Sequence, residues 1–391
     1  MEGPIMIPRM LSGKLIELAK GFPVICLTGP RQSGKTTLVK SVFSDYSYVS
    51  LENIDTMTAA KEDPRRFLAP YQNSGLIIDE AQRVPELFSY LQGIVDSSGQ
   101  MGRYVLTGSQ NFLLLEKITQ SLAGRAAILH LMPFSVSEVE GAGLLAPSLD
   151  EVLFKGMYPP LFDRPVAPVD FYPSYIETYL ERDVRSMKNI GDLALFRKFL
   201  LLCAGRTGQL LNMTALGNET GVDHKTIRAW LSVLEASFLV FLLRPYHRNW
   251  NKRMVKQPKL YFYDTGLLCS LLGLRKAADL ASHHLRGSIY ENYVIAEHSK
   301  RQFHEGIRPA DFFWRDHSGH EVDLIIEDGP AIRAVEIKSS ETVNPQFFDG
   351  LRWFCGQTGL SPENCTLVYG GTEAYAYSAG QVFSWKRAGC L

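Results

Sequence analysis

Gly29-Pro30-Arg31-Gln32-Ser33-Gly34-Lys35-Thr36 matches the pattern G-x-x-x-x-G-K-[ST] at every constrained position. Glycines in such a loop let the backbone turn tightly, so that successive N–H groups converge on phosphate oxygens, while the lysine reaches the β- and γ-phosphates and the threonine hydroxyl binds Mg²⁺. The apolar run at 23–28 predicts a buried strand before the loop, and Lys35 to Phe43 predicts a helix whose positive N-terminal end faces the phosphates. This context disfavours a chance glycine loop. We therefore predict that the loop, together with Thr37, binds the phosphates of a nucleotide.

Two carboxylates follow the next strongly apolar strand, residues 75–80. A parallel strand buried on both faces should be this uniformly apolar, with functional groups at its carboxyl end. There Asp79 is expected to hold Mg²⁺ through water, and Glu80 to polarise the water that attacks the γ-phosphate. The alternative is that both acids only cap the following helix.

Two further positions complete the predicted nucleotide site. Residues 103–110 form a strand with a polar end, where Ser109 or Gln110 is placed to sense the γ-phosphate. Arg125 stands between a helix end and the strand at 126–131. Several oligomeric ATPases place an arginine finger there, reaching a neighbour's nucleotide, and an ordinary cation near a helix C-terminus is an equally good explanation.

Composition sets broad limits on the class of protein. The chain has 391 residues, of which 46% are hydrophobic and 21% charged, which is typical of a globular protein with several domains. Lys+Arg and Asp+Glu both number 41, so any nucleic-acid binding must come from local basic patches. The six cysteines form no C-x-x-C pair, which suits a reducing compartment, and the longest apolar run, 238–243, is too short to span a bilayer. With no signal pattern at the N-terminus, a cytoplasmic protein without a membrane partner is expected.

The middle of the chain predicts two helical segments. Residues 133–195 suit a lid on the nucleotide domain, in which Arg182 or Arg185 either touches nucleotide or belongs to a solvated, salt-bridged face. Residues 196–278 combine helices near 214–216 and 223–234 with strands at 238–243 and 259–263, the pattern of a helix-turn-helix followed by a wing. From Arg244 to Lys259 the sequence holds six Lys or Arg residues and no acid, interleaved with aromatic residues. Such a patch suits DNA, although winged helices also dock proteins.

The last segment carries a second group of chemically active residues. Strands at 320–326 and 331–338 are joined by a Glu-Asp-Gly-Pro turn, and alternation along the second strand places Glu336 and Lys338 on one face, beside Asp323 of the first. Two carboxylates can hold Mg²⁺ against a phosphodiester, and the ammonium neutralises transition-state charge. This D-x(12)-E-x-K hairpin resembles the PD-(D/E)XK nuclease fold, and the resemblance implies Glu291, on the preceding helix, as a further metal ligand.

The arrangement of motifs resembles a known family over nearly the whole chain. The loop strand, the Asp79-Glu80 strand, the polar-ended strand and Ser121-Leu122-Ala123-Gly124-Arg125 look like the AAA+ branch of the P-loop ATPases. With the stretch Pro258 to Leu267 and the hairpin from Glu321 to Lys338, they resemble a widespread prokaryotic family of predicted ATPases. The resemblance implies an α/β protein with a three-layer P-loop AAA+ ATPase domain (1–132), a helical lid (133–195), a winged helix (196–278) and a restriction-endonuclease-like domain (279–391).

Two functions follow as expectations. The first is a Mg²⁺-dependent ATPase, with ATP and Mg²⁺ as cofactors, whose nucleotide state controls a DNA-binding winged helix and a nuclease-like domain, as a homo-oligomer if Arg125 acts in trans. The second is an ATP-switched regulator that binds DNA or a protein partner without cutting it. An NTP-dependent enzyme acting on a protein substrate is a third possibility, for which the sequence offers no added nucleophile.

Overall fold

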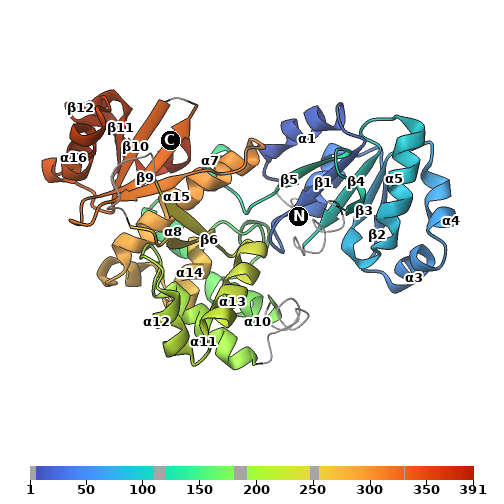
Figure 1. Ribbon diagram of the computed structural model, residues 1–391, viewed down its shortest axis with the longest axis horizontal. Coiled ribbons are helices and arrows are strands. Elements are labelled where there is room, and N and C mark those ends of the chain that lie inside the picture. Colours follow the sequence, from blue (N-terminus) through green and yellow to red (C-terminus); the bar gives the residue numbers. More distant parts are fainter. Residues whose placement is uncertain (1–5, 110–117, 119, 180–191, 247–254, 330) are drawn as a thin grey trace. The chain divides into compact units, whose positions relative to one another are not determined.

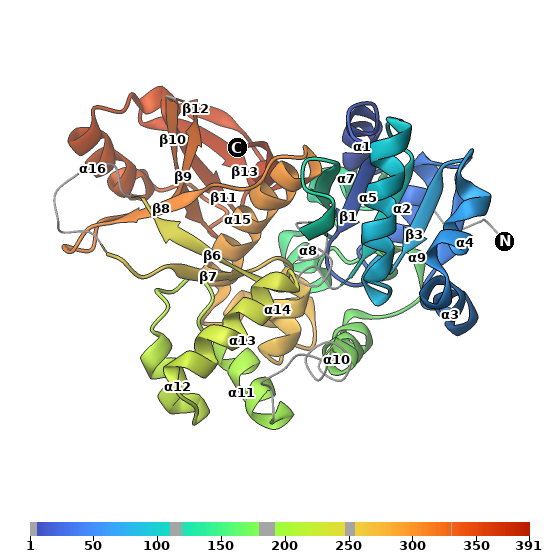
Figure 2. The same cartoon turned by 45° about the vertical axis from the view of Figure 1, so that its right-hand side comes forward.

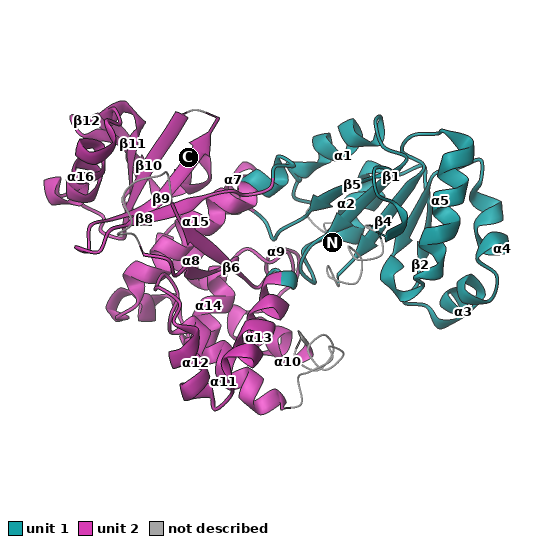
Figure 3. Cartoon of the chain, viewed as in Figure 1, with its two compact units in different colours: residues 1–134, 236–238, 302–307 teal, residues 135–235, 239–301, 308–391 magenta. Residues whose placement is uncertain are grey.

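The computed structural model describes residues 6–109, 118, 120–179, 192–246, 255–329 and 331–391. Their chain divides into two compact units (Figure 3). Unit 1 comprises Met1–Phe134, Ala236–Phe238 and Gln302–Ile307, and unit 2 comprises Ser135–Glu235, Leu239–Arg301 and Arg308–Leu391. Predictions that involve Gln110, Arg182, Arg185 and the basic stretch 247–254 fall outside the described residues.

Unit 1 is built on a parallel sheet with the strand order β2-β3-β4-β1-β5. The strands are β1 (Val24–Thr28), β2 (Ser47–Ser50), β3 (Leu76–Asp79), β4 (Tyr104–Gly108) and β5 (Ala126–His130). Strands β1, β3 and β4 are buried along their whole length, as uniformly apolar parallel strands should be. The predicted α/β class with a parallel sheet is therefore confirmed. Because β4 lies between β1 and β3, the ends of these three strands share one edge of the sheet.

Helices cover both faces of this sheet (Figure 1). Alternation along β1 sends Ile25 and Leu27 into a core with α1 (Leu11–Ala19) and α2 (Lys35–Val42), and Val24 and Cys26 into a core with helices of the opposite face. Those helices are α3 (Ile54–Glu62), α4 (Pro64–Leu68) and α5 (Glu86–Ser98). The result is a three-layer arrangement whose loops at the carboxyl edge of the sheet are free to carry function.

Unit 2 contains an eight-stranded mixed sheet with the order β12-β13-β11-β10-β9-β8-β6-β7 among the described residues. Its strands are β6 (Val240–Pro245), β7 (Lys259–Phe262), β8 (Phe312–Arg315), β9 (Glu321–Asp328), β10 (Ala331–Lys338), β11 (Cys365–Tyr369), β12 (Tyr375–Tyr377) and β13 (Gly380–Ser384). Strand β9 pairs antiparallel with both β8 and β10. Strand β11 pairs parallel with both β10 and β13. The hairpin predicted at 320–338 is present as β9 and β10.

The remaining helices lie wholly or mainly in unit 2. They are α7 (Val136–Gly141), α8 (Leu149–Lys155), α9 (Pro160–Asp163), α10 (Pro168–Tyr179), α11 (Leu193–Ala204), α12 (Met213–Thr220), α13 (His224–Ala236), α14 (Thr265–Leu271), α15 (Arg286–His304) and α16 (Asp349–Thr358). In Figures 1 and 2, α11, α12 and α13 gather at one end of the unit and α16 lies at the other. Among helices of the described residues, none combines the length and the apolar composition needed to cross a bilayer.

The segment predicted to be a winged helix has the expected order of elements, α12, α13, β6 and β7, and its two strands pair antiparallel. However, β6 also pairs in parallel with β8 through Arg244 and Phe312. The hairpin is therefore an extension of the C-terminal sheet, and residues on both sides of position 278 share one sheet. Separate winged-helix and nuclease-like domains remain a prediction.

Candidate functional site

The phosphate loop adopts the conformation that its glycines permit. Gly29 and Gly34 have φ values of 148° and 91°, and Gln32 between them has φ 58°. A Cβ on Gly29 would lie 2.2 Å from the carbonyl oxygen of Leu131, so this position admits no side chain. Left-handed residues interspersed in a loop can turn successive N–H groups toward one concavity, which is how backbone amides bind anions.

Two polar side chains in the loop are buried and placed for an anion. The Nζ of Lys35, which is 7% exposed, donates to the carbonyl oxygens of Gly29 at 3.0 Å and Pro30 at 2.6 Å. The hydroxyl of Ser33 is fully buried and has no hydrogen-bond partner among the described residues. A buried polar atom without a partner is costly unless a ligand satisfies it. The loop therefore fits the phosphates of a nucleotide.

Asp79 at the end of β3 collects hydroxyl donors from three segments. Its Oδ2 accepts from the Thr36 Oγ1 and the Tyr48 hydroxyl, each at 2.8 Å, and its Oδ1 accepts from the Thr107 hydroxyl. Burial, together with the hydrogen bond to Asp79, raises the pKa of Tyr48 to about 12, so Tyr48 stays a donor. The Thr36 hydroxyl and the Asp79 carboxylate are hard oxygen ligands of the kind Mg²⁺ prefers. These two residues would hold that ion.

Glu80 follows directly and is held by its own neighbours. Its backbone has φ 54°, in the left-handed region, which is unusual for a non-glycine residue and typical of functional turns. Its Oε2 accepts from Gln82 Nε2 at 2.6 Å and from the Ser109 hydroxyl at 3.2 Å. Because β3 and β4 are neighbours, the structure brings Ser109 and Glu80 together; the role of Ser109 in sensing the γ-phosphate stays a prediction.

Arg125 lies at the other edge of the sheet. It immediately precedes β5, where Ala126 pairs with Val24 at the start of β1, whereas the loop follows the end of β1. The five residues of β1 span about 16 Å, so Arg125 does not reach the phosphate loop of its own chain. Its guanidinium binds both carboxylate oxygens of Asp96, and this contact raises the pKa of Arg125 and lowers that of Asp96.

The sequence did not reveal three residues that support this site. Arg9 donates from Nη1 to the Ser33 carbonyl at 2.8 Å and from Nη2 to the Met132 carbonyl at 2.7 Å, with its guanidinium over the Phe134 ring. Tyr48 and Thr107 hold Asp79. None of these residues belongs to a local motif. Only the place of Thr107, at the polar end of β4, could have indicated a role in the site.

In unit 2, the predicted Asp323, Glu336 and Lys338 converge. The Lys338 ammonium contacts Glu336 Oε1 and lies 3.9 Å from Asp323 Oδ2, which also accepts the Ile337 N–H at 2.8 Å. Burial raises the pKa of Glu336 to about 8, with the Asp323 charge adding to the effect and Lys338 opposing it. Glu336 Oε2 is buried and has no hydrogen-bond partner in the part of the chain that the structure describes. An unpartnered buried carboxylate oxygen beside a second carboxylate fits a divalent cation.

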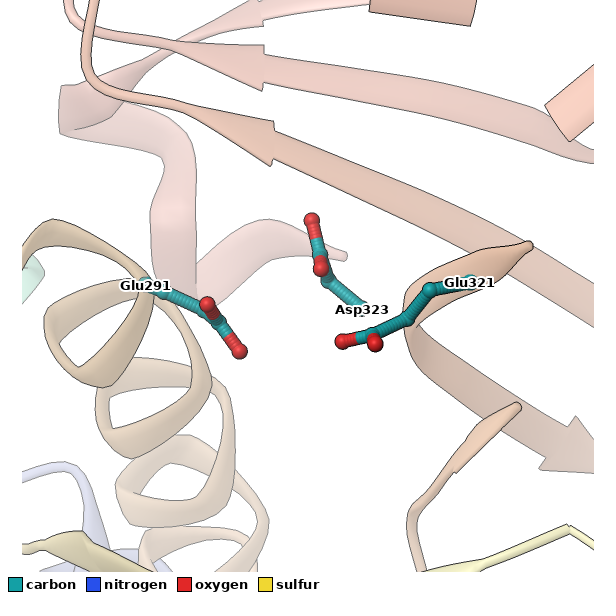
Figure 4. A group of neighbouring side chains, drawn as sticks. All are labelled: Glu291, Glu321 and Asp323. Carbon is teal, nitrogen blue, oxygen red and sulfur yellow. The ribbon is translucent and has the colours of Figure 1, made fainter. Parts of the chain in front are cut away.

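The predicted third ligand, Glu291, lies in a neighbouring cluster. Figure 4 shows Glu291 on α15 pointing toward Glu321 and Asp323 of β9, and one oxygen of each lies within 4.8 Å of the others. Glu291 Oε1 accepts from Lys259 Nζ at 2.8 Å and from the Tyr261 hydroxyl. Glu321 was not predicted from the sequence, although alternation along β9 places it on the same face as Asp323. The role of Lys259 was not predicted either, since Lys259 was counted only as part of a basic patch.

Three family models match successive parts of the chain. Residues 21–140 match an "AAA domain", residues 146–278 a "Domain of unknown function (DUF8612)" and residues 286–387 a "Domain of unknown function (DUF4143)". The first match covers the phosphate loop, Asp79, Glu80 and Arg125. It supports an ATPase-like domain of the AAA type, as the resemblance implied.

Solved structures with weak similarity to this chain were also found. The "walker-type atpase paby2304" of Pyrococcus abyssi is 15% identical, with a TM-score of 0.47, over 68% of this chain and 96% of that one. AMPPCP-bound DnaA from Aquifex aeolicus is 14% identical, with a TM-score of 0.32, over 57% and 85%. These low values carry no functional argument.

Relatives among known sequences are closer. "Uncharacterized protein Rv2008c" of Mycobacterium tuberculosis is 32% identical over 361 residues, which are 91% of this chain and 78% of the relative. "Uncharacterized protein Mb2031c" of Mycobacterium bovis matches equally well. Since this similarity extends through both units, the chain belongs to the family of these mycobacterial proteins.

Proposed function

We propose that unit 1 binds ATP and hydrolyses it in the presence of Mg²⁺. The observation that carries the proposal is the placement of Glu80. It directly follows the Asp79 carboxylate that accepts from Thr36 of the loop, and Gln82 and Ser109 hold its side chain. A carboxylate fixed just beyond a Mg²⁺ site is what hydrolysis of a γ-phosphate requires of a general base.

Each residue has a distinct task in this proposal. The Lys35 ammonium exchanges the carbonyls of Gly29 and Pro30 for the β- and γ-phosphates, and the loop N–H groups bind the remaining oxygens. Thr36 and Asp79 would hold Mg²⁺, which neutralises phosphate charge. Glu80 accepts a proton from the attacking water, and Ser109 orients Glu80. Arg125, turned away from its own loop, would complete the site of a neighbouring chain in a homo-oligomer.

Phosphate release from ATP tests the proposal. Glu80→Gln should lower turnover about 100-fold or more while ATP still binds, the usual contribution of a general base, and Lys35→Ala should abolish ATP binding. Glu86→Gln removes an exposed carboxylate six residues further along and serves as the matched control. Wild-type turnover no higher than that of Lys35→Ala would contradict hydrolysis.

For unit 2 we propose metal-dependent cleavage of DNA, because Asp323, Glu336 and Lys338 converge around the unpartnered Glu336 Oε2. Asp323 and Glu336 would hold Mg²⁺, which polarises a phosphodiester, and Lys338 would neutralise developing charge. The segment 196–278 would bind the DNA under control of the nucleotide state.

Supercoiled plasmid incubated with Mg²⁺ or Mn²⁺ tests this second function. Nicking should be lost in Asp323→Ala and Lys338→Ala and kept in the control Lys386→Ala. If the wild-type protein cuts under no condition, the alternative function is favoured, in which the protein is an ATP-switched binder of DNA or of a protein. A nucleotide-dependent shift in DNA mobility would then identify DNA as the partner.

A further inference from the structure

Lys259 brings a permanent positive charge into the carboxylate cluster of unit 2. It lies on β7 and is only 2% exposed. Its Nζ contacts Glu291 Oε1 at 2.8 Å and Glu321 Oε1, and it lies 5.4 Å from the centre of the Phe313 ring. A buried ammonium is costly unless it is paired with charged groups or hydrogen-bonded. The pair Glu291 and Glu321 supplies those partners from two different elements, α15 and β9.

Each of these two acids also has a second donor. The Tyr261 hydroxyl also donates to Glu291 Oε1, and Arg315 Nη1 lies 3.0 Å from Glu321 Oε2. Both oxygens of Glu321 are thus bound to cations. A divalent ion at this position would have to displace Lys259, whose side chain is almost completely buried.

The neighbouring carboxylates differ. Asp323 uses Oδ2 for the Ile337 N–H, and none of the described residues donates to its Oδ1. Glu336 uses Oε1 for Lys338, and its buried Oε2 has no partner among the same described residues. Asp323 and Glu336, on adjacent strands, thus each keep an oxygen without a donor among the described residues, whereas the two glutamates of the group in Figure 4 are already paired with Lys259.

We propose that Lys259 is the resident cation of the Glu291–Glu321 position and excludes a divalent metal from it. The inference rests on the proposed metal-dependent function of unit 2 and narrows it: the metal is held by Asp323 and Glu336, and Glu291 is a positioning residue for Lys259. The ammonium of Lys259 supplies the positive charge that a second metal ion would otherwise bring to Glu291 and Glu321, and it does not exchange with solvent ions. Chemistry at the domain is then that of a one-metal site flanked by two lysines, Lys259 and Lys338.

Counting bound Mn²⁺ by electron paramagnetic resonance tests this inference without measuring activity. The protein is kept free of nucleotide and carries Asp79→Asn, so that unit 1 contributes no metal. One Mn²⁺ per chain is expected, with affinity lowered at least tenfold in Glu336→Gln and within twofold of the parent in Glu291→Gln. Lys259→Met should gain a second Mn²⁺ and lose it again when Glu321→Gln is added.

The possible outcomes separate the inference from the function on which it rests. Equal loss of Mn²⁺ in Glu291→Gln and Glu336→Gln would overturn the inference, and so would a folded Lys259→Met variant that gains no Mn²⁺. If Lys259→Met does not fold, comparing the Mn²⁺ affinities of the near-isosteric variants Glu291→Gln and Glu336→Gln still tests the inference. A parent protein that binds no Mn²⁺, beside a Lys259→Met variant that binds one, would support exclusion by Lys259 and refute the proposed metal-dependent cleavage.

Discussion

Arg9 connects the segment before α1 to the phosphate loop, and replacing it by alanine should weaken ATP binding about tenfold. Its two guanidinium nitrogens donate to the carbonyls of Ser33 at 2.8 Å and Met132 at 2.7 Å. Hydrogen bonds that involve a charged group contribute about 1.5–3 kcal/mol each, and the lower value applies because Arg9 is only partly buried. The two bonds together are then worth about 3 kcal/mol to unit 1.

Only the bond to Ser33 acts on the loop itself. Without this bond, ordering the loop around phosphate would cost about 1.5 kcal/mol more of the ATP binding energy. About 1.4 kcal/mol corresponds to a tenfold change in Kd. Arg9→Lys keeps the charge but cannot span both carbonyls, so its Kd should fall between those of wild type and Arg9→Ala.

Isothermal titration of ATP with Mg²⁺ measures these affinities. Arg65→Ala is the matched control, since it removes an exposed arginine of α4 within the same unit. A folded Arg9→Ala variant whose Kd for ATP lies within twofold of wild type would show that the Ser33 contact does not organise the loop, and the reasoning would fail.

Two further predictions concern unit 2, which holds all five tryptophans and whose unfolding can be followed by their fluorescence. Buried Asp264 accepts from the Met157 and Leu267 N–H groups and the Tyr172 hydroxyl, so Asp264→Asn sets an amide N–H₂ against at least one of these donors. We expect a loss of about 1–3 kcal/mol in denaturant unfolding, and a loss below about 0.5 kcal/mol would contradict this account. Burial raises the pKa of Glu235, so the folded state binds a proton more tightly than the unfolded state and loses stability as pH rises above the ordinary carboxyl range. Glu235→Gln should therefore be more stable than wild type at pH 8 and nearly equal to it at pH 4, and a difference that does not change with pH would refute the assignment.

Local patterns predicted much of this molecule because their physical causes are local. The loop from Gly29 to Thr36 could be identified because its chemistry requires particular residue types at fixed spacing. The convergence of Asp323, Glu336 and Lys338 followed from side-chain alternation along two strands joined by a short turn. The uniformly apolar strands of unit 1 indicated a parallel sheet, because a strand that is buried on both faces has no polar positions.

The features that escaped prediction depend on contacts between distant segments. Nothing near Lys259 in the sequence indicates that it contacts Glu291, 32 residues away. In the same way, nothing near Arg9 indicates that it contacts Ser33. Strand β6 shows the same alternation whether it forms an isolated wing with β7 or also joins β8, so its pattern could not reveal the continuous eight-stranded sheet. Pairing of this kind is decided by packing of the whole unit.

Lys35 and Lys259 show how one residue type serves two opposite purposes. Both ammonium groups are more than nine-tenths buried, but Lys35 is bound to the neutral carbonyls of Gly29 and Pro30, whereas Lys259 is bound to the carboxylates of Glu291 and Glu321. A neutral carbonyl is a weaker partner for an ammonium than a phosphate, so an arriving nucleotide can draw Lys35 away. No such exchange favours Lys259, because its departure would leave the Glu291 carboxylate without its cation. Burial lowers the pKa of Lys259, yet the nearby Glu291 and other acidic groups raise it well above its ordinary value, which keeps the charge in place. The partner of each lysine therefore determines whether its charge is available to a ligand or is a fixed part of the fold.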